Sequence, residues 1–167
     1  MNTSAIIVCA GNSTRMGGVN KILLPLGDTL VIGNTLRAFE KAESIKEIII
    51  VTKSDYVPQI EKEAERIGIS KPLKFAEGGE TRQQSVINGI RCIGSDTEMV
   101  AIHDGARPLV KPEHIEAVIK DAGVFGGATL GVPVKDTIKV VDDGLITDTP
   151  HRASLYITQT PQVFKRR

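Results

Sequence analysis

Hydrophobic residues in this chain fall into short continuous runs that alternate with longer periodic stretches. The runs are rich in β-branched residues and are bounded by turn residues, which is typical of strands buried on both faces of a parallel sheet. We predict such strands at residues 5–9, 48–52, 73–76, 99–103 and 128–134. Between them, apolar residues recur every three or four positions, which predicts amphipathic helices at residues 30–41, 58–67, 81–93 and 112–122.

Strands that alternate with helices indicate a three-layer α/β sandwich with a mostly parallel sheet and right-handed crossovers. Ligands of such folds bind at the carboxyl ends of the strands. Residues 136–149 depart from this pattern, because apolar and polar residues alternate around Asp142, Asp143 and Gly144. This predicts a β-hairpin with a tight turn. We expect residues 136–155 to form a protruding β-arm within a single domain that spans residues 1–167.

Charge and composition narrow the classes of partner. The chain has 21 Lys and Arg against 20 Asp and Glu, and a net charge of +1 argues against a nucleic-acid partner. Cys9 and Cys92 do not form a Cys-x-x-Cys pair, and no apolar run is long enough to span a membrane. Without a signal-like leader, we expect a cytoplasmic protein with reduced thiols, in which Cys9 belongs to the core.

The segment after the first predicted strand is suited to binding a nucleoside triphosphate. Gly11, Gly17 and Gly18 allow main-chain N–H groups to approach phosphate oxygens, while Arg15 and Lys21 add positive charge. The spacing matches neither a Walker A loop nor the Gly-x-Gly-x-x-Gly fingerprint of dinucleotide-binding folds. The alternative is a plain turn whose glycines serve only geometry and whose cations are solvated.

A second polar segment, residues 78–85, lies between a predicted strand and a predicted helix with Thr81 as its N-cap. The N-terminus of a helix favours anionic or acceptor-rich ligands. Ser85 and the glycine backbone could bind a base edge, and Glu80 could reach ribose hydroxyls. Arg82 could bind a phosphate or brace the loop. The alternative is a capped helix preceded by an ordinary glycine turn.

A third segment, residues 100–108, ends an apolar strand with an acid and a base. Asp104 is placed to hold Mg²⁺, which prefers one or two carboxylates together with substrate phosphates, and Arg107 would face a phosphate. The alternative is an Asp–Arg ion pair at a strand end. We expect His103 to be a buried partner of a backbone group rather than a catalyst.

A fourth set comprises residues 133–139, 151–156 and 158–162. Spacing alone indicates edge-strand and turn residues. Because these residues flank the predicted hairpin with hydroxyls and cations, they could also form a second anion site.

Taken together, these segments resemble the 2-C-methyl-D-erythritol 4-phosphate cytidylyltransferases, a family of sugar-nucleotide-type nucleotidyltransferases, over nearly the whole chain. The resemblance implies a Rossmann-like domain, a homodimer with interlocking arms, and transfer of CMP from CTP to the polyol phosphate with release of pyrophosphate. The family usually continues beyond the Thr-Pro-Gln turn at residues 160–162, so this chain is expected to lack its C-terminal segment.

The resemblance also implies roles for individual residues. Arg15 and Lys21 would be catalytic, and Mg²⁺ would be held by Asp104. The nucleotide would be bound by Ala10, Gly11, Gly78, Gly79, Glu80, Arg82 and Ser85. The acceptor would be bound by Asp104, Gly105, Arg107, Thr137, Arg152 and Thr160, some of them from the neighbouring subunit.

Other functions remain compatible with the sequence. A ribitol 5-phosphate cytidylyltransferase shares the loops and differs in the acceptor pocket. A GTP-using nucleotidyltransferase also places Gly, Arg and Lys after its first strand. A nucleotide-binding module without catalysis is the alternative from outside the enzymes.

Overall fold

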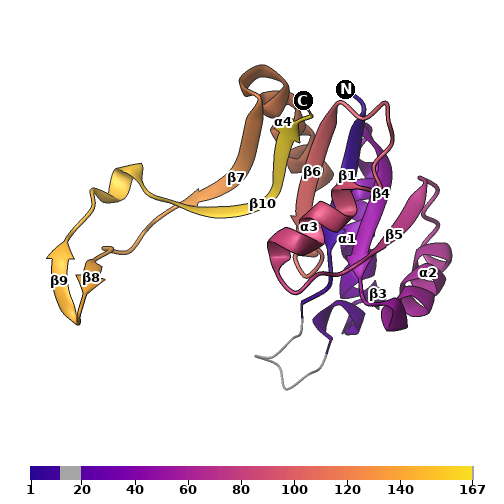
Figure 1. Cartoon of the computed structure of the whole chain (residues 1–167), viewed down its shortest axis with the longest axis horizontal. Coiled ribbons are helices and arrows are strands. Elements are labelled where there is room, and N and C mark those ends of the chain that lie inside the picture. Colours follow the sequence, from indigo (N-terminus) through magenta and orange to yellow (C-terminus); the bar gives the residue numbers. More distant parts are fainter. Residues whose placement is uncertain (12–19, 167) are drawn as a thin grey trace.

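The computed structural model describes residues 1–11 and 20–166, which form a six-stranded sheet flanked by helices, with an arm extending from one side (Figure 1). The strand order is β5-β4-β1-β6-β10-β7. β1 pairs in parallel with β4 and β6, and β5 pairs in parallel with β4. The strands are β1 (Thr3–Val8), β4 (Ile45–Thr52), β5 (Leu73–Glu77), β6 (Met99–Asp104), β7 (Gly127–Pro133) and β10 (Tyr156–Lys165). The predicted α/β fold with a mostly parallel sheet is confirmed.

The strand β10 corrects the prediction. Residues 158–162 were expected at an edge or in a turn, whereas β10 lies inside the sheet and runs antiparallel to both β6 and β7. Polar residues interrupt its first half, so it lacks the continuous apolar run of the other inner strands. Its register with β7 also shifts between Thr158 and Gln162.

Each face of the sheet is covered by its own helices. The larger core lies under α1 (Val31–Lys41), α2 (Val57–Arg66) and α4 (Pro112–Phe125), and the smaller core lies under α3 (Arg82–Ile90). Along β1, Ile7 belongs to the first core and Ile6 to the second, because neighbouring side chains of a strand point to opposite faces. Burial on both faces explains the continuous apolar runs of the sequence.

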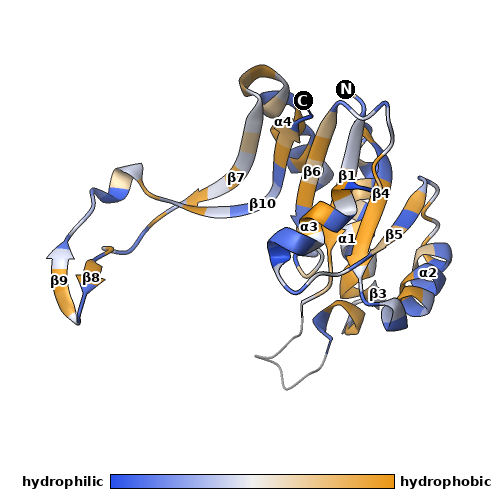
Figure 2. Ribbon diagram, in the orientation of Figure 1, coloured by the Kyte–Doolittle hydropathy of each residue, from blue (hydrophilic) through white to orange (hydrophobic). Residues whose placement is uncertain are grey.

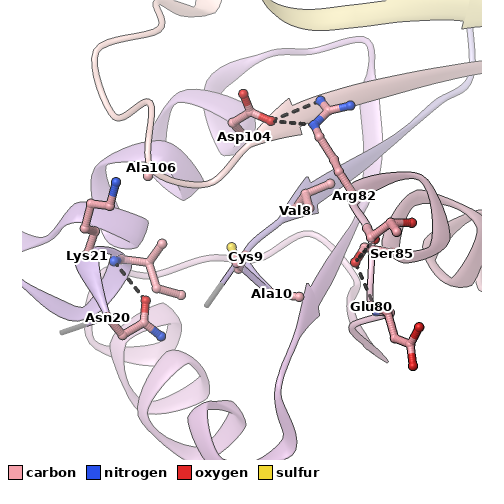
Figure 3. A pocket seen from close by; sticks show the side chains of 14 residues that line it. Val8, Cys9, Ala10, Asn20, Lys21, Glu80, Arg82, Ser85, Asp104 and Ala106 are labelled. Atoms are coloured by element: carbon pink, nitrogen blue, oxygen red, sulfur yellow. Dashed lines mark hydrogen bonds and ion pairs between the residues drawn. The ribbon is translucent and has the colours of Figure 1, made fainter. Parts of the chain in front are cut away.

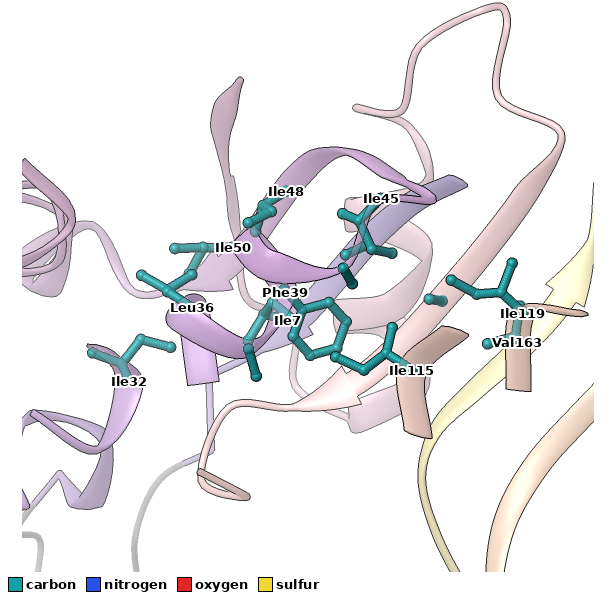
Figure 4. Packing of buried hydrophobic residues seen from close by; sticks show 14 of the residues in the cluster. Ile7, Ile32, Leu36, Phe39, Ile45, Ile48, Ile50, Ile115, Ile119 and Val163 are labelled. Carbon is teal, nitrogen blue, oxygen red and sulfur yellow. The ribbon is translucent and has the colours of Figure 1, made fainter. Parts of the chain in front are cut away.

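In the larger core, the apolar face of α1 packs on the sheet (Figure 4). Leu36 and Phe39 on α1 are fully buried near Ile7, Ile48 and Ile50 of the strands. Burying a side chain of this size contributes roughly 1.5–3 kcal/mol to stability. This packing fixes the strands whose carboxyl ends carry the polar segments.

A small hairpin leads from residue 20 into α1. It comprises the 3-10 helix η2 (Lys21–Leu23) and the short strands β2 (Pro25–Leu26) and β3 (Thr29–Leu30). Glu63 of α2 anchors this hairpin, since its buried carboxylate accepts hydrogen bonds from the Thr29 hydroxyl and, at 2.9 Å, from the Leu30 N–H. Arg66 pairs with the same carboxylate at 2.8 Å, and together these donors lower the pKa of Glu63 to about 2.

The predicted hairpin is present as β8 (Val140–Asp142) and β9 (Leu145–Asp148), which lie far from the main sheet at the end of the arm (Figure 1). Asp143 and Gly144 both have positive φ, as a type I′ turn requires. Hydrophobic residues lie on the two strands of the arm (Figure 2). They are exposed, including Leu145 at 71% and Ile146 at 63%. In the part of the chain that the structure describes, no helix has the length and hydrophobicity needed to cross a membrane.

Candidate nucleotide-binding site

A cavity of about 400 Å³ opens at the carboxyl ends of β1 and β6, beside the N-terminus of α3 (Figure 3). Figure 3 shows Lys21 on one side and Arg82 and Ser85 on the other, with Ala10 between them. The structure therefore brings together most of the residues predicted to bind a nucleotide. Of the residues predicted to bind the nucleotide, the cavity is lined by Ala10, Gly11, Gly79, Glu80, Arg82 and Ser85, but not by Gly78. Lys21, predicted to be catalytic, and Asp104, predicted to bind the acceptor and Mg²⁺, line the same cavity.

The loop before α3 packs tightly on the loop after β1. A Cβ atom on Gly78 would lie 2.2 Å from the Cβ of Ala10, and a Cβ on Gly79 would lie 2.2 Å from the Cγ of Gln84. Glycine is therefore required at both positions by close approach. The contact of Gly78 with Ala10 brings the loop before α3 against the loop after β1.

The N-terminus of α3 is ordered by side-chain caps. The hydroxyl of Thr81 accepts a hydrogen bond from the Gln84 N–H at 3.1 Å, which confirms its predicted role as N-cap. The buried hydroxyl of Ser85 accepts from the Gly79 N–H and donates to the Thr81 carbonyl, each at 3.0 Å. Ser85 thus braces the loop from within, and its predicted contact with a base stays a prediction.

Lys21 stands at the start of η2, on the opposite side of the cavity. The side-chain oxygen of Asn20 accepts a hydrogen bond from the Ile22 N–H at 3.3 Å, so Asn20 caps this short helix and holds the backbone of Lys21. The capping role of Asn20 was not predicted, although Asn is a preferred residue at the N-cap of a helix. Arg15, the other predicted catalytic cation, lies outside the described residues, as do Gly17 and Gly18.

Asp104, the last residue of β6, lies between two arginines. Its Oδ1 accepts hydrogen bonds from Arg82 at 3.0 and 3.2 Å, and its Oδ2 accepts one from Arg107 at 3.0 Å. Partial burial raises the pKa of Asp104, but the hydrogen bonds from Arg107 and Arg82 outweigh burial, and the pKa lies below its ordinary value. The Asp–Arg ion pair considered from the sequence is therefore present.

This arrangement of Asp104 does not fit a metal ligand. Both carboxylate oxygens are engaged by guanidinium groups, and the two arginines outweigh the single negative charge, which disfavours a nearby cation. Within residues 1–11 and 20–166 there is no group of at least three His, Cys, Asp or Glu side chains able to hold a metal ion. Magnesium at Asp104 stays a prediction that would require an ion pair to open.

Two neighbouring residues with reactive side chains are buried and neutral. Cys9 is in the core as predicted, and burial raises the pKa of its thiol, so it is not a nucleophile at neutral pH. The ring of His103 is fully buried, and burial lowers its pKa to about 4. Its Nε2 lies 3.2 Å from the carbonyl oxygen of Arg107, which confirms the predicted backbone partner.

A second cavity of about 600 Å³ adjoins the first at Ala106 and is lined by Arg107, Gln159 and Thr160. Gln159 contacts the guanidinium of Arg107, a pairing that was not predicted because 52 positions separate the two residues. Gly105, predicted to bind the acceptor, lines neither cavity, and a Cβ atom at this position would lie 2.3 Å from the Sγ of Cys9.

The arm residues predicted to bind the acceptor lie elsewhere. Thr137 and Arg152 are exposed and line neither cavity, and Arg152 donates a hydrogen bond to the Lys135 carbonyl at 2.8 Å. Figure 1 shows the arm pointing away from the sheet. Within one chain, the structure does not bring these two residues to the site.

Thr35 is a further residue that sequence reasoning missed. Its buried hydroxyl donates to the Gly105 carbonyl at 2.9 Å, which ties α1 to the turn after β6. A threonine on the buried face of a predicted helix was the only available signal, and it does not identify the partner.

Comparison with known proteins agrees with this geometry. The family described as IspD, 2-C-methyl-D-erythritol 4-phosphate cytidylyltransferase, matches residues 3–167. A curated enzyme of that name from Caldanaerobacter subterraneus is 49% identical over 99% of this chain and 74% of its own length. One from Bacillus cereus is 42% identical over 95% of this chain and 70% of its own length.

Solved structures show the same fold. The 4-diphosphocytidyl-2C-methyl-D-erythritol synthase from Anaerococcus prevotii superposes with a TM-score of 0.87 at 29% identity, covering 98% of this chain and 70% of that one. The cytidylyltransferase from Thermus thermophilus superposes with a TM-score of 0.70 at 27% identity, with the same coverage. The chain belongs to the IspD family of 2-C-methyl-D-erythritol 4-phosphate cytidylyltransferases.

Proposed function

We propose that this chain transfers CMP from CTP to 2-C-methyl-D-erythritol 4-phosphate and releases pyrophosphate. The observation that carries the proposal is the cavity that joins the loop after β1 to the N-terminus of α3, with Lys21 and Arg82 on opposite sides. Main-chain N–H groups and two cations of this kind suit a triphosphate. Family membership supports the identity of both substrates.

In the proposed reaction, a phosphate oxygen of the acceptor attacks the α-phosphorus of CTP in line. A new P–O bond forms, and the bond from the α-phosphorus to the bridging oxygen breaks, so that pyrophosphate leaves with the electron pair. Catalysis then consists of positioning and charge stabilisation by Lys21 and Arg15, without a covalent intermediate on the protein. As a further part of the proposal, Mg²⁺ would be held by triphosphate oxygens, which are among the ligands it prefers.

The proposed acceptor site lies on the Arg107 side of the turn after β6. Arg107 would bind the phosphate of the acceptor, with Asp104 and Gly105 beside it. Thr137 and Arg152 would come from the arm of a second copy, since they are remote from both cavities of their own chain. The exposed apolar residues of the arm support a homodimer, because burying them would stabilise the association.

Pyrophosphate release from the purified 167-residue chain, with CTP, Mg²⁺ and the methylerythritol phosphate, tests this proposal. Lys21→Ala is expected to lower the rate by roughly 100- to 1,000-fold, as for the loss of one preorganised charge-stabilising group. Lys62→Ala, at an exposed position on α2, is the matched control and should retain the wild-type rate. Near-normal turnover by Lys21→Ala would contradict the assignment.

Two further assays separate the alternative functions. Faster turnover with ribitol 5-phosphate or with GTP would replace the proposed acceptor or nucleotide. CTP binding measured by calorimetry, without pyrophosphate release, would identify a binding module.

A further inference from the structure

A chain of hydrogen bonds links the turn after β6 to β10. The hydroxyl of Thr160 lies 3.2 Å from the Asp104 backbone nitrogen and 2.9 Å from the Nδ1 of His103. The Nε2 of His103 lies 3.2 Å from the carbonyl oxygen of Arg107. Both ends of the substrate-facing turn, Asp104 and Arg107, are therefore held by one pair of buried side chains.

The direction of each hydrogen bond follows from its ends. The Asp104 N–H can only donate, so the oxygen of Thr160 accepts from it and directs its own proton to the Nδ1 of His103. The Arg107 carbonyl can only accept, so the Nε2 of His103 carries the ring proton. A neutral imidazole satisfies both requirements in one tautomer.

Packing keeps this arrangement rigid. His103 has no exposed surface, Thr160 is 7% exposed, and the ring of Phe39 packs on the imidazole at a centroid distance of 5.0 Å. Water therefore cannot readily replace either partner. Buried, fully satisfied polar networks of this kind specify one geometry.

The same turn is tied to β10 at its exposed surface. Arg107 contacts the side chain of Gln159, and the hydroxyl of Thr129 on β7 donates to the Gln159 carbonyl at 3.0 Å. Gln159 and Thr160 lie where the register of β10 shifts, between its arm half and its sheet half. The turn is thus fastened to the base of the arm on both its buried and its exposed side.

We propose that His103 and Thr160 are positioning residues that set Asp104 and Arg107 for the acceptor phosphate, so that Thr160 acts through these neighbours and not by contact with the acceptor. The inference rests on the proposed function, since it assigns the turn to acceptor binding. Nucleotide binding should depend on these hydrogen bonds less than acceptor binding does, because they reach the nucleotide side of the cavity only through the ion pair of Asp104 with Arg82.

Steady-state kinetics of Thr160→Val, Thr160→Ser and His103→Phe test the proposal. Valine removes the hydroxyl at nearly constant volume, serine restores it, and phenylalanine removes both ring nitrogens while Thr160 stays intact. Thr160→Val and His103→Phe are each expected to raise the KM for the acceptor about tenfold, the value of one net hydrogen bond, with the KM for CTP within about twofold of wild type. Thr160→Ser should restore the acceptor KM.

Two kinetic outcomes would overturn the inference. An unchanged acceptor KM in His103→Phe, with an increase in Thr160→Val, would show that His103 is not a positioning residue. Equal increases in both KM values would indicate a general structural role.

A measurement without substrates separates this inference from the proposed function. The ¹⁵N spectrum of the imidazoles at neutral pH should show His103 protonated at Nε2 and hydrogen-bonded at Nδ1, with the Nδ1 signal shifted in Thr160→Val. A ring protonated at Nδ1 would overturn the inference even in an active enzyme. Failure of the wild-type chain to release pyrophosphate would instead refute the proposed function.

Discussion

The buried histidine makes the stability of this protein depend on pH in a defined window. Burial lowers the pKa of His103 from 6.5 to about 4, whereas the unfolded chain exposes the ring to water. Between these two values the unfolded chain binds more protons than the folded one. The free energy of unfolding should therefore fall as the pH is lowered from 6.5 towards 4.

The size of this effect follows from the same two values. The pKa shift from 6.5 to about 4 lowers the free energy of unfolding by about 3 kcal/mol once the pH has fallen below both values. At about pH 5 roughly 2 kcal/mol of this should already be lost relative to about pH 7.5. Asp104 and Glu63, whose pKa values are lowered, contribute stability that is lost only at more acidic pH.

Urea unfolding at several pH values between about 7.5 and 5 measures this dependence directly. Phenylalanine at position 103 cannot titrate. Across this pH range the free energy of unfolding of His103→Phe should therefore fall by roughly 2 kcal/mol less than that of wild type. His114→Gln, at an exposed helical position, is the matched control and should follow the wild-type profile. Equal losses in wild type and His103→Phe would refute the assignment of the pH dependence to the buried ring.

Other substitutions probe the packing around the site and the arm. Gly105→Ala should cost about 1–3 kcal/mol in urea unfolding, because the new Cβ atom would meet the Sγ of Cys9, and adding Cys9→Ala should recover part of the loss; additive losses would contradict this. Glu63→Gln should lower the free energy of unfolding by about 2 kcal/mol at pH 7, and this difference from wild type should shrink as the pH falls from 4.5 towards 2. A difference that stayed constant over this pH range would exclude the charge of Glu63 as the cause. Leu145→Asp should shift the proposed dimer towards monomer in light scattering and raise the KM for the acceptor, whereas an unchanged mass would locate the dimer contact elsewhere.

The inner strands were predictable because burial on both faces leaves a direct trace in sequence. In β4, residues 48–51 are all apolar and are followed by Thr52, and all five residues are buried. β10 leaves no such trace, since its arm half is exposed and its register breaks among polar residues. β10 is inserted between β6 and β7, and its partner β6 lies more than fifty residues away in the sequence. Local sequence patterns do not encode a pairing over such a distance.

The candidate site shows the same division. Lys21, Arg82 and Asp104 could be assigned to one site because the segments that carry them each come after a predicted strand, at the same edge of the sheet. Their partners could not be derived in this way. The ion pair of Asp104 with Arg82 and the hydrogen bond from Thr160 to His103 depend on which side chains the packed sheet brings within 3 Å or so of each other.

The antiparallel direction of β10 has a consequence that links the fold to the proposed mechanism. β10 pairs with β6 from Gln162 to Lys165, so the residues just before this segment lie at the carboxyl end of β6, beside Asp104. A parallel strand in the same position would send the connection to the arm out at the opposite edge of the sheet. Because β10 runs antiparallel, one continuous strand carries Thr160 at the site and leads directly into the arm. In the proposed dimer, the strand that leads into the arm would therefore be the same strand that holds the turn after β6 through Thr160.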